Sequence, residues 1–490
     1  MHHAASPTAL LDGAGVKAAD ALAIASGIPL GDLIDRAGEA VAARAEEGLS
    51  EGSRIAVWAG PGSNGADARV AAKRLSERHR VTVFTFGQGE CDDGSRPLGT
   101  FDDRRYDLVI DGLFGTGLKR ALDDECAGAV RRLAAGGSPV LSVDVPSGID
   151  AGTGNVLGEA VKAQRTVTFE RRRAAHLLMP GREYCGQVIV ADIGIPQDVW
   201  ARVPAVAVAN EPASWMRSLA HPSMAGHKYD RGHAVVFAGP IEKGGGARLS
   251  AISALRGGAG LVTLAAPHDA LAGLSVQVTA LMLRGCGSSD DLRTLLEDER
   301  FNAFVLGPGF GDADRARAFA ELVLERDRAI VLDADAITAS AGAPENLFRL
   351  CRGRPGRAVL TPHGGEFRRL FPDLAEDASL SKLQATQSAA ERAGAVVVSK
   401  GADTVIASPD GRAAINATGT PWLATAGTGD VLAGIVAAQL AQGTPAFEAA
   451  CAGVWMHGRA AENFGPGLIS EDLPEMLPRV HAELAALRDA

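Results

Sequence analysis

Short apolar runs alternate with longer amphipathic stretches along most of the chain. Apolar positions between residues 22 and 41 recur near helical spacing, which predicts helices within residues 17–49. Further runs in the first half predict strands at residues 54–59, 81–86, 108–110 and 140–143 and a helix at residues 66–78. Strands that alternate with helices favour a parallel sheet covered by helices on both faces.

The alternation lapses around residues 203–222, where prolines and polar residues replace the apolar runs. It then begins again, with strands predicted at residues 233–238, 261–265, 304–306, 329–332, 359–360 and 395–399 and helices at 246–256 and 430–442. A chain of 490 residues is also long for a single core. We therefore predict an α/β protein with two three-layer αβα domains, residues 1–209 and residues 222–490.

Composition narrows the classes of partner. The formal net charge of −10 disfavours binding to nucleic acid or to an anionic membrane, and aromatic residues are too few to indicate a base-stacking platform. The six cysteines are scattered without a CxxC pair, and no apolar stretch approaches the ~20 residues of a membrane span. We expect a cytoplasmic protein with small-molecule partners, no nucleic acid and no membrane.

Polar and glycine-rich turns follow the predicted strands, at the sheet edge where doubly wound folds bind ligands. The first, residues 60–65, matches the GxGxxG pattern of dinucleotide-binding turns between a strand and a helix. The acidic residue expected about 20 residues later is missing, because residues 81–86 run into Gly87 and Gln88. An ordinary Rossmann dehydrogenase and a turn without any ligand both remain alternatives for this motif.

Two further turns converge on the same edge of the first sheet. Glycines in residues 111–119 let backbone N–H groups approach a phosphate, and Lys119 adds a positive charge. In residues 143–150, Asp144 is a candidate functional residue, and a plain turn or helix-capping residue is the alternative. Hard oxygen ligands suited to a monovalent cation or to water are offered by Asn64, Asp111 and Ser147.

Three motifs in this order, AGPGSNGAD (59–67), DGLFGTGLK (111–119) and VDVPSGID (143–150), resemble those of the NAD(P)H-hydrate epimerase domain. The resemblance implies a Rossmann-like fold and a potassium site at Asn64, Asp111 and Ser147. Asp144 is then the leading acid/base candidate, because epimerising C6 of the hydrated ring needs a placed proton donor or acceptor. The implied substrate contacts are Ser63, Asn64, Gly65, Ala66, Asp67, Gly115, Thr116, Gly117, Leu118, Lys119, Arg120, Ala121 and Asp144.

The first of these turns departs from the pattern PGNNGGDG that is usual in the family. Ser63 replaces an asparagine, and Ala66 and Ala68 replace glycines, which adds bulk where a ligand backbone should pass. The basic position in residues 169–173 is Arg where Lys is common. These changes could weaken the epimerase.

Residues 426–430 read AGTGD and lead into a strongly apolar helix. Such a turn presents successive backbone N–H groups at a helix N-terminus, a place suited to negative charge. Asp430 beside it suits a base that deprotonates a hydroxyl as a phosphoryl group arrives, the logic of ribokinase-like transfer. An aspartate that merely caps the helix is the alternative. The GxxxxGK[ST] motif is absent from the sequence, so a P-loop kinase is not indicated.

Four other turns follow predicted strands of the second half, at residues 307–311, 333–336, 361–367 and 399–404. Any one of them, including those that contain Asp335 or His363, could be an ordinary turn. Their common position at strand carboxyl ends nevertheless predicts one shared cleft.

The motifs GPGFG, TPHGGEF, KGADT and AGTGD, in this order, resemble the ADP/ATP-dependent NAD(P)H-hydrate dehydratase of the ribokinase superfamily over most of residues 222–490. Residues 239–243 depart from the family's usual Gly-Ser opening. The resemblance implies a ribokinase-like fold, ADP or ATP as co-substrate, and Mg²⁺. The hydrate contacts it implies are Ala247, Gly309, Gly311, His363, Glu366 and Asp430, and the nucleotide contacts are Lys400, Gly401, Ala402, Asp403, Thr404, Gly427, Thr428 and Gly429.

Together the two resemblances imply a bifunctional NAD(P)H-hydrate repair enzyme, and family likeness favours a homo-oligomer. The first domain would interconvert the R and S hydrates. The second would phosphorylate the C6 hydroxyl of the S epimer, after which phosphate leaves and NAD(P)H is restored. A small-alcohol kinase is the alternative from another enzyme class. A nucleotide-binding scaffold with an inactive first domain is the non-enzyme alternative.

Overall fold

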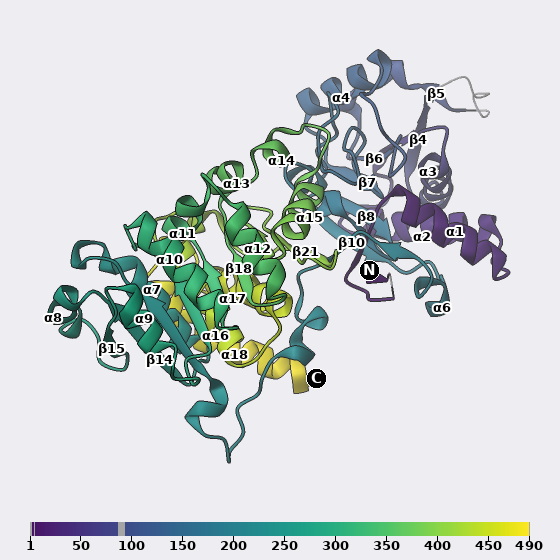
Figure 1. The fold of residues 1–490 in the computed structure, drawn as a ribbon. Coiled ribbons are helices and arrows are strands. Elements are labelled where there is room, and N and C mark those ends of the chain that lie inside the picture. Colours follow the sequence, from purple (N-terminus) through teal and green to yellow (C-terminus); the bar gives the residue numbers. More distant parts are fainter. Residues whose placement is uncertain (1, 4, 87–93, 490) are drawn as a thin grey trace. The chain divides into compact units, whose positions relative to one another are not determined.

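Two units make up the chain, Met1–Ala209 and Asn210–Ala490 (Figure 1). The computed structural model describes residues 2–3, 5–86 and 94–489. Gly87, Gln88 and Cys91, which entered the sequence predictions, lie outside the described residues. Residues 210–221, left between the two predicted domains, belong to the second unit.

The first unit contains a parallel sheet in the order β10-β8-β7-β6-β3-β4-β5. Its strands are β3 (Arg54–Ala59), β4 (Arg80–Thr85), β5 (Arg96–Pro97), β6 (Leu108–Gly112), β7 (Val140–Val143), β8 (Arg165–Phe169) and β10 (Gln187–Ala191). The predicted bounds of β3 and β7 are confirmed. Strands β5, β8 and β10 were not predicted.

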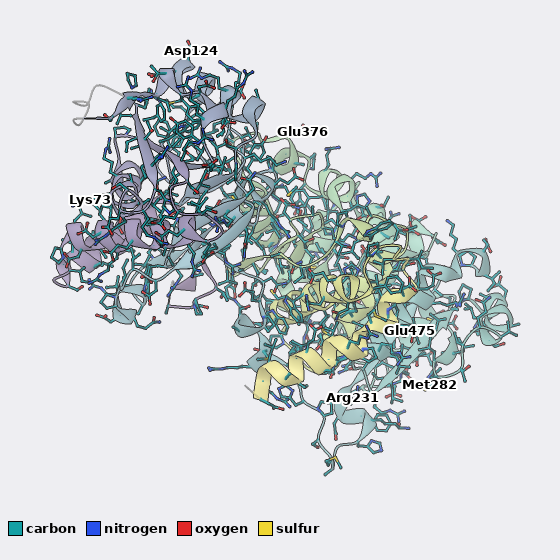
Figure 2. The ribbon with its side chains drawn as sticks, turned by 180° about the vertical axis from the view of Figure 1, so that it is seen from behind. Lys73, Asp124, Arg231, Met282, Glu376 and Glu475 are labelled. Atoms are coloured by element: carbon teal, nitrogen blue, oxygen red, sulfur yellow. The ribbon has the colours of Figure 1, made fainter. Side chains whose placement is uncertain are left out.

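Helices cover both faces of this sheet. On one face, Val41 of α2 (Leu30–Glu46) and Ala71 of α3 (Ser63–Leu75) share a buried cluster with Val57 of β3. On the other face, Val130 of α4 (Asp124–Gly136) shares a second cluster with Trp58 of β3. Figure 2 shows Lys73 on α3 and Asp124 at the start of α4 pointing outward from these two layers. The predicted three-layer arrangement is confirmed for this unit.

The N-terminal segment joins the same unit through a small ribbon of strands in the order β12-β2-β9. These strands are β2 (Ala9–Leu11), β9 (Arg172–Arg173) and β12 (Ala207–Ala209). Leu11 pairs with Arg173, so the helix that follows, α1 (Gly13–Ala25), begins next to residues distant in sequence. Asp12 caps this helix by accepting a hydrogen bond from the N–H of Gly15.

The second unit contains a larger sheet whose strands follow the order β15-β14-β13-β16-β17-β18-β19-β20-β21. They are β13 (His233–Phe237), β14 (Leu261–Ala266), β15 (Met282–Gly285), β16 (Ala303–Leu306), β17 (Ala329–Leu332), β18 (Ala358–Leu360), β19 (Val396–Ser399), β20 (Val405–Ala407) and β21 (Ala413–Ile415). Neighbours from β15 to β19 are parallel, and β20 and β21 continue antiparallel.

Two groups of helices pack with this sheet. One comprises α7 (Gly244–Arg256), α16 (Thr428–Ala441), α17 (Ala446–Phe464) and α18 (Asp472–Asp489), and the other α10 (Ala313–Glu325), α11 (Ala334–Ser340), α12 (Glu345–Gly353) and α15 (Lys382–Ala393). Helix α16 is buried along nearly its whole length, because neighbours surround its apolar side chains.

Two helices begin earlier than predicted. Helix α3 begins at Ser63 rather than Ala66, and α16 begins at Thr428 rather than Asp430. Glycine occupies the cap position in both, at Gly62 and Gly427. Asp430 therefore lies inside the first turn of α16 and does not cap it, which removes the capping alternative.

Two further observations concern the described parts of the chain. No helix there is both long and apolar enough to cross a membrane. The five cysteines described there, Cys126, Cys185, Cys286, Cys351 and Cys451, are buried and form no disulfide.

Candidate active sites

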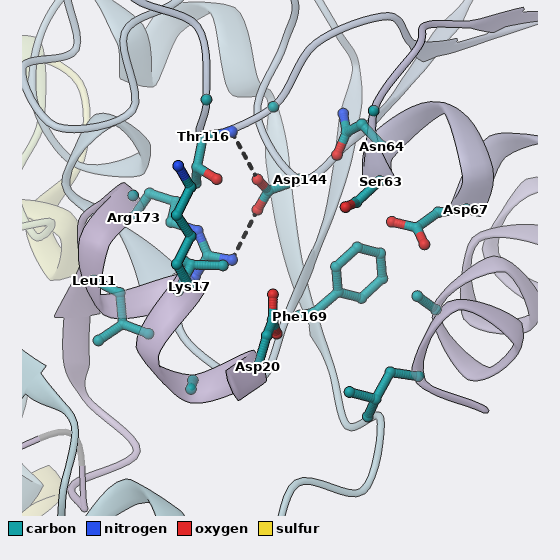
Figure 3. A pocket seen from close by; sticks show the side chains of 18 of the residues that line it. Leu11, Lys17, Asp20, Ser63, Asn64, Asp67, Thr116, Asp144, Phe169 and Arg173 are labelled. Carbon is teal, nitrogen blue, oxygen red and sulfur yellow. Dashed lines mark hydrogen bonds and ion pairs between the residues drawn. The ribbon is translucent and has the colours of Figure 1, made fainter. Parts of the chain in front are cut away.

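A cavity of about 750 Å³ opens at the carboxyl ends of β3, β6 and β7 in the first unit, beside α1 (Figure 3). Nine predicted substrate contacts line it, namely Ser63, Asn64, Asp67, Gly115, Thr116, Gly117, Leu118, Lys119 and Asp144. The remaining predicted contacts, Gly65, Ala66, Arg120 and Ala121, are not among its lining residues. The motifs thus converge in space as their common position after strands predicts.

Asp144 is held in a fixed orientation at the end of β7. Its backbone has φ of 64°, a left-handed conformation that non-glycine residues adopt at a cost. One carboxylate oxygen accepts from the N–H of Thr116 at 3.1 Å, and the other accepts from the hydroxyl of Thr168 at 3.0 Å. The second oxygen also pairs with the guanidinium of buried Arg173 at 3.0 Å. The carboxylate therefore faces the cavity in one preset position.

His176 supports this conformation from behind. Its Nδ1 accepts from the N–H of Arg173 at 3.0 Å, so Nε2 carries the proton and donates to the Asp144 carbonyl at 2.9 Å. Burial lowers the pKa of His176 to about 4, so the ring is neutral at physiological pH. It contributes a fixed hydrogen bond to the backbone of Asp144.

Gly115 lets the turn after β6 close over the same carboxylate. A Cβ there would lie 2.7 Å from Oδ1 of Asn64 and 2.9 Å from Oδ2 of Asp144. Nδ2 of Asn64 donates to the Val143 carbonyl at 2.8 Å, so its amide oxygen is directed away from that carbonyl. Any side chain at residue 115 would displace one of these two groups.

Lys119 extends from the same turn over the cavity edge. Its ammonium contacts the Asp150 carboxylate at 3.1 Å, and that carboxylate also accepts from the N–H groups of Gly152 and Thr153. The lysine side chain is largely exposed. It remains able to meet a phosphate at the mouth of the cavity.

The predicted potassium ligands meet beneath this turn. Asp111 is fully buried, and its carboxylate accepts from Ser142 Oγ at 2.9 Å, Ser147 Oγ at 2.6 Å and Ser147 N at 2.9 Å. The carbonyl of Asn64 lies beside Gly112, the next residue. Burial raises the pKa of Asp111, and the hydrogen bonds oppose this. Within the described residues this carboxylate has no Lys, Arg or His ion partner.

Several residues that line the cavity were not among the predicted substrate contacts, although residues 169–173 were noted for their basic position. They are Lys17 and Asp20 of α1, together with Phe169, Glu170 and Arg173. Asp20 and the predicted Asp67 both have a raised pKa, chiefly through burial, and Asp67 reaches about 8. The helical pattern of α1 contains no mark of this role, because β2 brings it to the site only in the folded chain.

The second unit gathers its predicted residues around the first turn of α16. Asp430 lies opposite the start of α7, where a Cβ at Gly246 would stand 2.7 Å from its Oδ2, and Ala247 follows directly. Ser250 Oγ donates to the Asp430 carbonyl at 2.7 Å. Burial first, and then the charge of Asp333, raise the pKa of Asp430 to about 6, while Lys400 opposes the shift.

Lys400 lies between Asp333 and the turn before α16. Its ammonium contacts Oδ1 of Asp333, a buried carboxylate after β17, at 2.7 Å. A Cβ at Gly429 would stand only 3.2 Å from that ammonium, so the cation lies directly beside the turn that begins at Gly427. Asp333 was noted only as part of a strand-end turn, yet it positions the cation.

The remaining predicted residues lie in turns and at helix starts of the same unit. Gly311 N donates to Asp335 at 2.8 Å after β16, where Gly309 and Gly311 both have positive φ. His363 and Glu366 form a capping box on α13 (Gly364–Leu370), which leaves the His363 ring largely exposed.

In the loop after β19, Gly401 N donates to Thr404 at 3.1 Å and Asp403 pairs with Lys382 at 2.6 Å, on either side of Ala402. Thr428 Oγ1 donates to the Leu423 carbonyl at 3.0 Å.

Both halves of the chain match known families. Residues 234–478 match the family described as NAD(P)H-hydrate dehydratase, and residues 30–174 match the YjeF-related protein N-terminus. A bifunctional NAD(P)H-hydrate repair enzyme from Gloeobacter violaceus is 34% identical over 92% of this chain and 93% of its own. The chain belongs to this family of bifunctional NAD(P)H-hydrate repair enzymes. The resemblance stated from the motifs is confirmed.

A second relative matches nearly the whole length of both chains, and two solved structures match parts of this chain. The bifunctional repair enzyme of Thermosynechococcus vestitus is 33% identical over 98% of both chains. Among solved structures, an ADP/ATP-dependent NAD(P)H-hydrate dehydratase from Bacillus subtilis is 25% identical over 56% of this chain and 98% of its own, with a TM-score of 0.48. A yeast protein covers 35% of this chain and 83% of its own at 22% identity, with a TM-score of 0.30.

Proposed function

We propose that the chain repairs hydrated NADH and NADPH in two steps. The first unit interconverts the R and S hydrates, and the second dehydrates the S epimer with ADP or ATP as co-substrate. One observation supports this most directly. A single chain of this family contains both a cavity lined by Asp144 and a site where Asp430 lies beside the glycine-rich turn at residues 426–430. The names of the relatives, which are bifunctional repair enzymes, support the same pairing.

In the first unit, the hydrated ring would enter beside Asp144 and the phosphates would lie along the turn that ends at Lys119. A cavity of about 750 Å³ is within the range that holds small molecules. The Asp144 carboxylate is already oriented by Arg173, so it needs no rearrangement before proton transfer. Ser63 and Asp67, which line the cavity from α3, would contact the ring or its ribose.

A potassium ion fits the oxygen atoms of Asn64, Asp111 and Ser147. The support is the fully buried Asp111 carboxylate, which hydrogen bonds satisfy but no cationic side chain of the described residues neutralises. Bound potassium would compensate this charge. We expect replacement of K⁺ by tetramethylammonium to lower both the thermal stability of the first unit and the epimerase rate. Asp111→Asn should remove the dependence on K⁺.

In the second unit, Asp430 would take the proton of the C6 hydroxyl while that oxygen attacks the terminal phosphorus of ADP or ATP. The N–H groups of residues 427–429 and the ammonium of Lys400 would stabilise the charge on the transferred group. Phosphate then leaves C6 with the C–O electron pair, and loss of a proton from C5 restores the ring double bond. This route converts a poor leaving group into a good one.

Mg²⁺ would be held mainly by the phosphates of the nucleotide. The described residues contain no group of three or more His, Cys, Asp or Glu side chains arranged to bind a metal. Magnesium commonly keeps water and substrate phosphates as ligands, so such a site agrees with its chemistry. When bound, the ion supplies charge neutralisation for phosphoryl transfer.

The test is the recovery of NADPH absorbance from a mixture of R and S NADPH hydrate, with Mg²⁺, K⁺ and ADP or ATP. Nearly complete recovery is expected, because the R epimer must pass through the first unit. Recovery that stops when the S epimer is consumed, apart from slow spontaneous epimerisation, would leave the dehydratase and reject the epimerase. If pure S hydrate is also inert with either nucleotide, the proposal fails, and a screen of small alcohols as phosphoryl acceptors becomes the next experiment.

A further inference from the structure

A second buried carboxyl faces the cavity of the first unit. Asp67 of α3 is 7% exposed, and its carboxyl makes no hydrogen bond or ion pair with any residue that the structure describes. Figure 3 shows Ser63 and Asp67 reaching from α3 toward the space that Asp144 enters from the end of β7. Burying a polar group without a partner costs free energy, so a ligand that completes its hydrogen bonds is the natural explanation.

Helix α2 packs closely against α3 at the backbone of Asp67. A Cβ at Gly38 of α2 would lie 2.4 Å from the Cβ of Val70 and 2.7 Å from the carbonyl of Asp67, so the two helices are in close contact there. The α2 residues that line the cavity are all apolar, namely Leu30, Leu33, Ile34 and Ala37. The cavity is therefore where the carboxyl can meet a polar group.

Asp67 and Asp144 differ in the charges around them. Asp144 pairs with Arg173 at 3.0 Å, whereas Asp67 has no cation in contact within the described chain. Burial, and then the charges of Asp144 and Asp20, raise the pKa of Asp67 to about 8, so it is a neutral acid at pH 7. The other charged groups that line the cavity are Asp12 and Lys17 near α1, Lys119 and Glu170.

This difference matches the requirement of the reaction. Inverting a carbon that carries a hydroxyl and a ring nitrogen means breaking one of these bonds and remaking it on the opposite face. One group must give a proton and another must take one. Two carboxyls whose surroundings differ can divide these roles. Arg173 cannot supply the proton, because a guanidinium stays protonated in proteins.

We propose that Asp67 is the proton donor that works with Asp144 as the proton acceptor when the first unit inverts C6 of the hydrated ring. Asp144 takes the hydroxyl proton while the O–H electrons form a C6 carbonyl. The C6–N1 electron pair moves to N1, which takes a proton from Asp67. After rotation about C5–C6 the ring closes on the other carbonyl face and both protons return, so nothing is consumed. This inference rests on the proposed epimerase function.

The test follows interconversion of purified R and S hydrates by the full chain with no nucleotide present. Asp67→Asn should lower kcat by about 10²–10⁴-fold, as loss of a general acid does. Asp67→Glu should recover part of the rate. Asp35→Asn, an exposed carboxyl on α2 outside the cavity, is the matched control and should leave the rate unchanged. Thermal unfolding of each variant shows whether the first unit is folded, and dehydration of pure S hydrate shows that the second unit is intact.

The pH profile separates a proton donor from a residue that only shapes the cavity. The wild-type rate should fall as pH rises through about 8, where Asp67 loses its proton. Asp20→Asn should move this fall to lower pH, because the charge of Asp20 helps to raise the pKa of Asp67. Asp67→Asn should abolish the fall.

Two results would overturn the inference, and they are distinguishable. A folded Asp67→Asn variant with the wild-type rate and the same fall above pH 8 would remove Asp67 from proton transfer while leaving the epimerase function intact. Wild-type protein that dehydrates S hydrate yet does not interconvert the epimers would reject the epimerase function itself.

Discussion

Single aspartates carry most of the proposed chemistry, and their surroundings decide what each can do. Asp144 is oriented by Arg173, Thr116 and Thr168, whereas Asp67 is buried without any such partner among the described residues. Asp430 stands between these cases, because the carboxylate of Asp333 and the ammonium of Lys400 shift its pKa in opposite directions. Residue type alone would not distinguish the three.

The dehydratase should show a rising pH limb that belongs to Asp430. A base acts as the carboxylate, so kcat with pure S hydrate should rise with pH through about 6 and then level off. Lys400→Met removes the charge that lowers this pKa, so the limb should move to higher pH. Asp430→Asn should lose about 10²–10⁴-fold in rate and show no limb. A limb near 6 that survives Asp430→Asn would assign it to another group.

Asp67 should reduce the stability of the folded chain at neutral pH. Its pKa is raised on folding, so below pH 4 it is protonated in both states, and as pH rises toward 8 the unfolded state increasingly gains from ionising. Asp67→Asn should therefore stabilise the first unit at pH 7 by on the order of 1–3 kcal/mol, with little effect at pH 4. Thermal unfolding at both pH values measures this. Equal shifts at the two pH values would contradict the cause.

The helices and strands that position these residues were predicted in part from the sequence. The alternating pattern predicted the strands of both sheets well, because burial on both faces leaves a continuous apolar run. It missed β5, β8, β10, β15, β20 and β21, and it placed the starts of α3 and α16 two or three residues late. Helix starts depend on caps, and glycine at the cap is a weak sequence signal.

The contact between α2 and α3 should tolerate no side chain at Gly38. Gly38→Ala places a Cβ against Val70 and the Asp67 carbonyl, so we expect the first unit to lose about 1–3 kcal/mol and epimerase activity to fall. Gly31→Ala, on the same helix but with open space around it, is the control and should be neutral or slightly stabilising. Denaturant unfolding followed together with the epimerase rate tests the pair. Equal effects of the two substitutions would show that the contact is not the cause.

As a whole, the molecule combines two proposed sites, and we expect them to share only a diffusible product, the S hydrate. The proposed epimerase needs no nucleotide and the proposed dehydratase needs no R hydrate, so each should work when the other is inactivated. The predicted homo-oligomer remains a prediction, and sedimentation of the full chain measures it.

Complementation between two inactive chains tests this independence. Asp144→Asn alone should restore only the S fraction of a hydrate mixture, and Asp430→Asn alone should restore none. A mixture of the two variants should again restore nearly all the NADPH absorbance, because the S epimer passes through solution. Failure of the mixture, with each single variant behaving as expected, would show that the two sites must be in one chain.

Local features of the sequence were enough for the alternation of strands and helices, the two glycine-rich sets of turns, and the family. The spacing of apolar positions and the residue types of turns depend on neighbours within a few residues, so the sequence alone predicts them. Tertiary structure decided that Asp20 and Arg173 join Asp144, that Asp333 holds Lys400, and that Asp67 lacks a partner in the described chain. These facts arise from the packing of segments far apart in sequence, which sets burial and charge and leaves no local pattern.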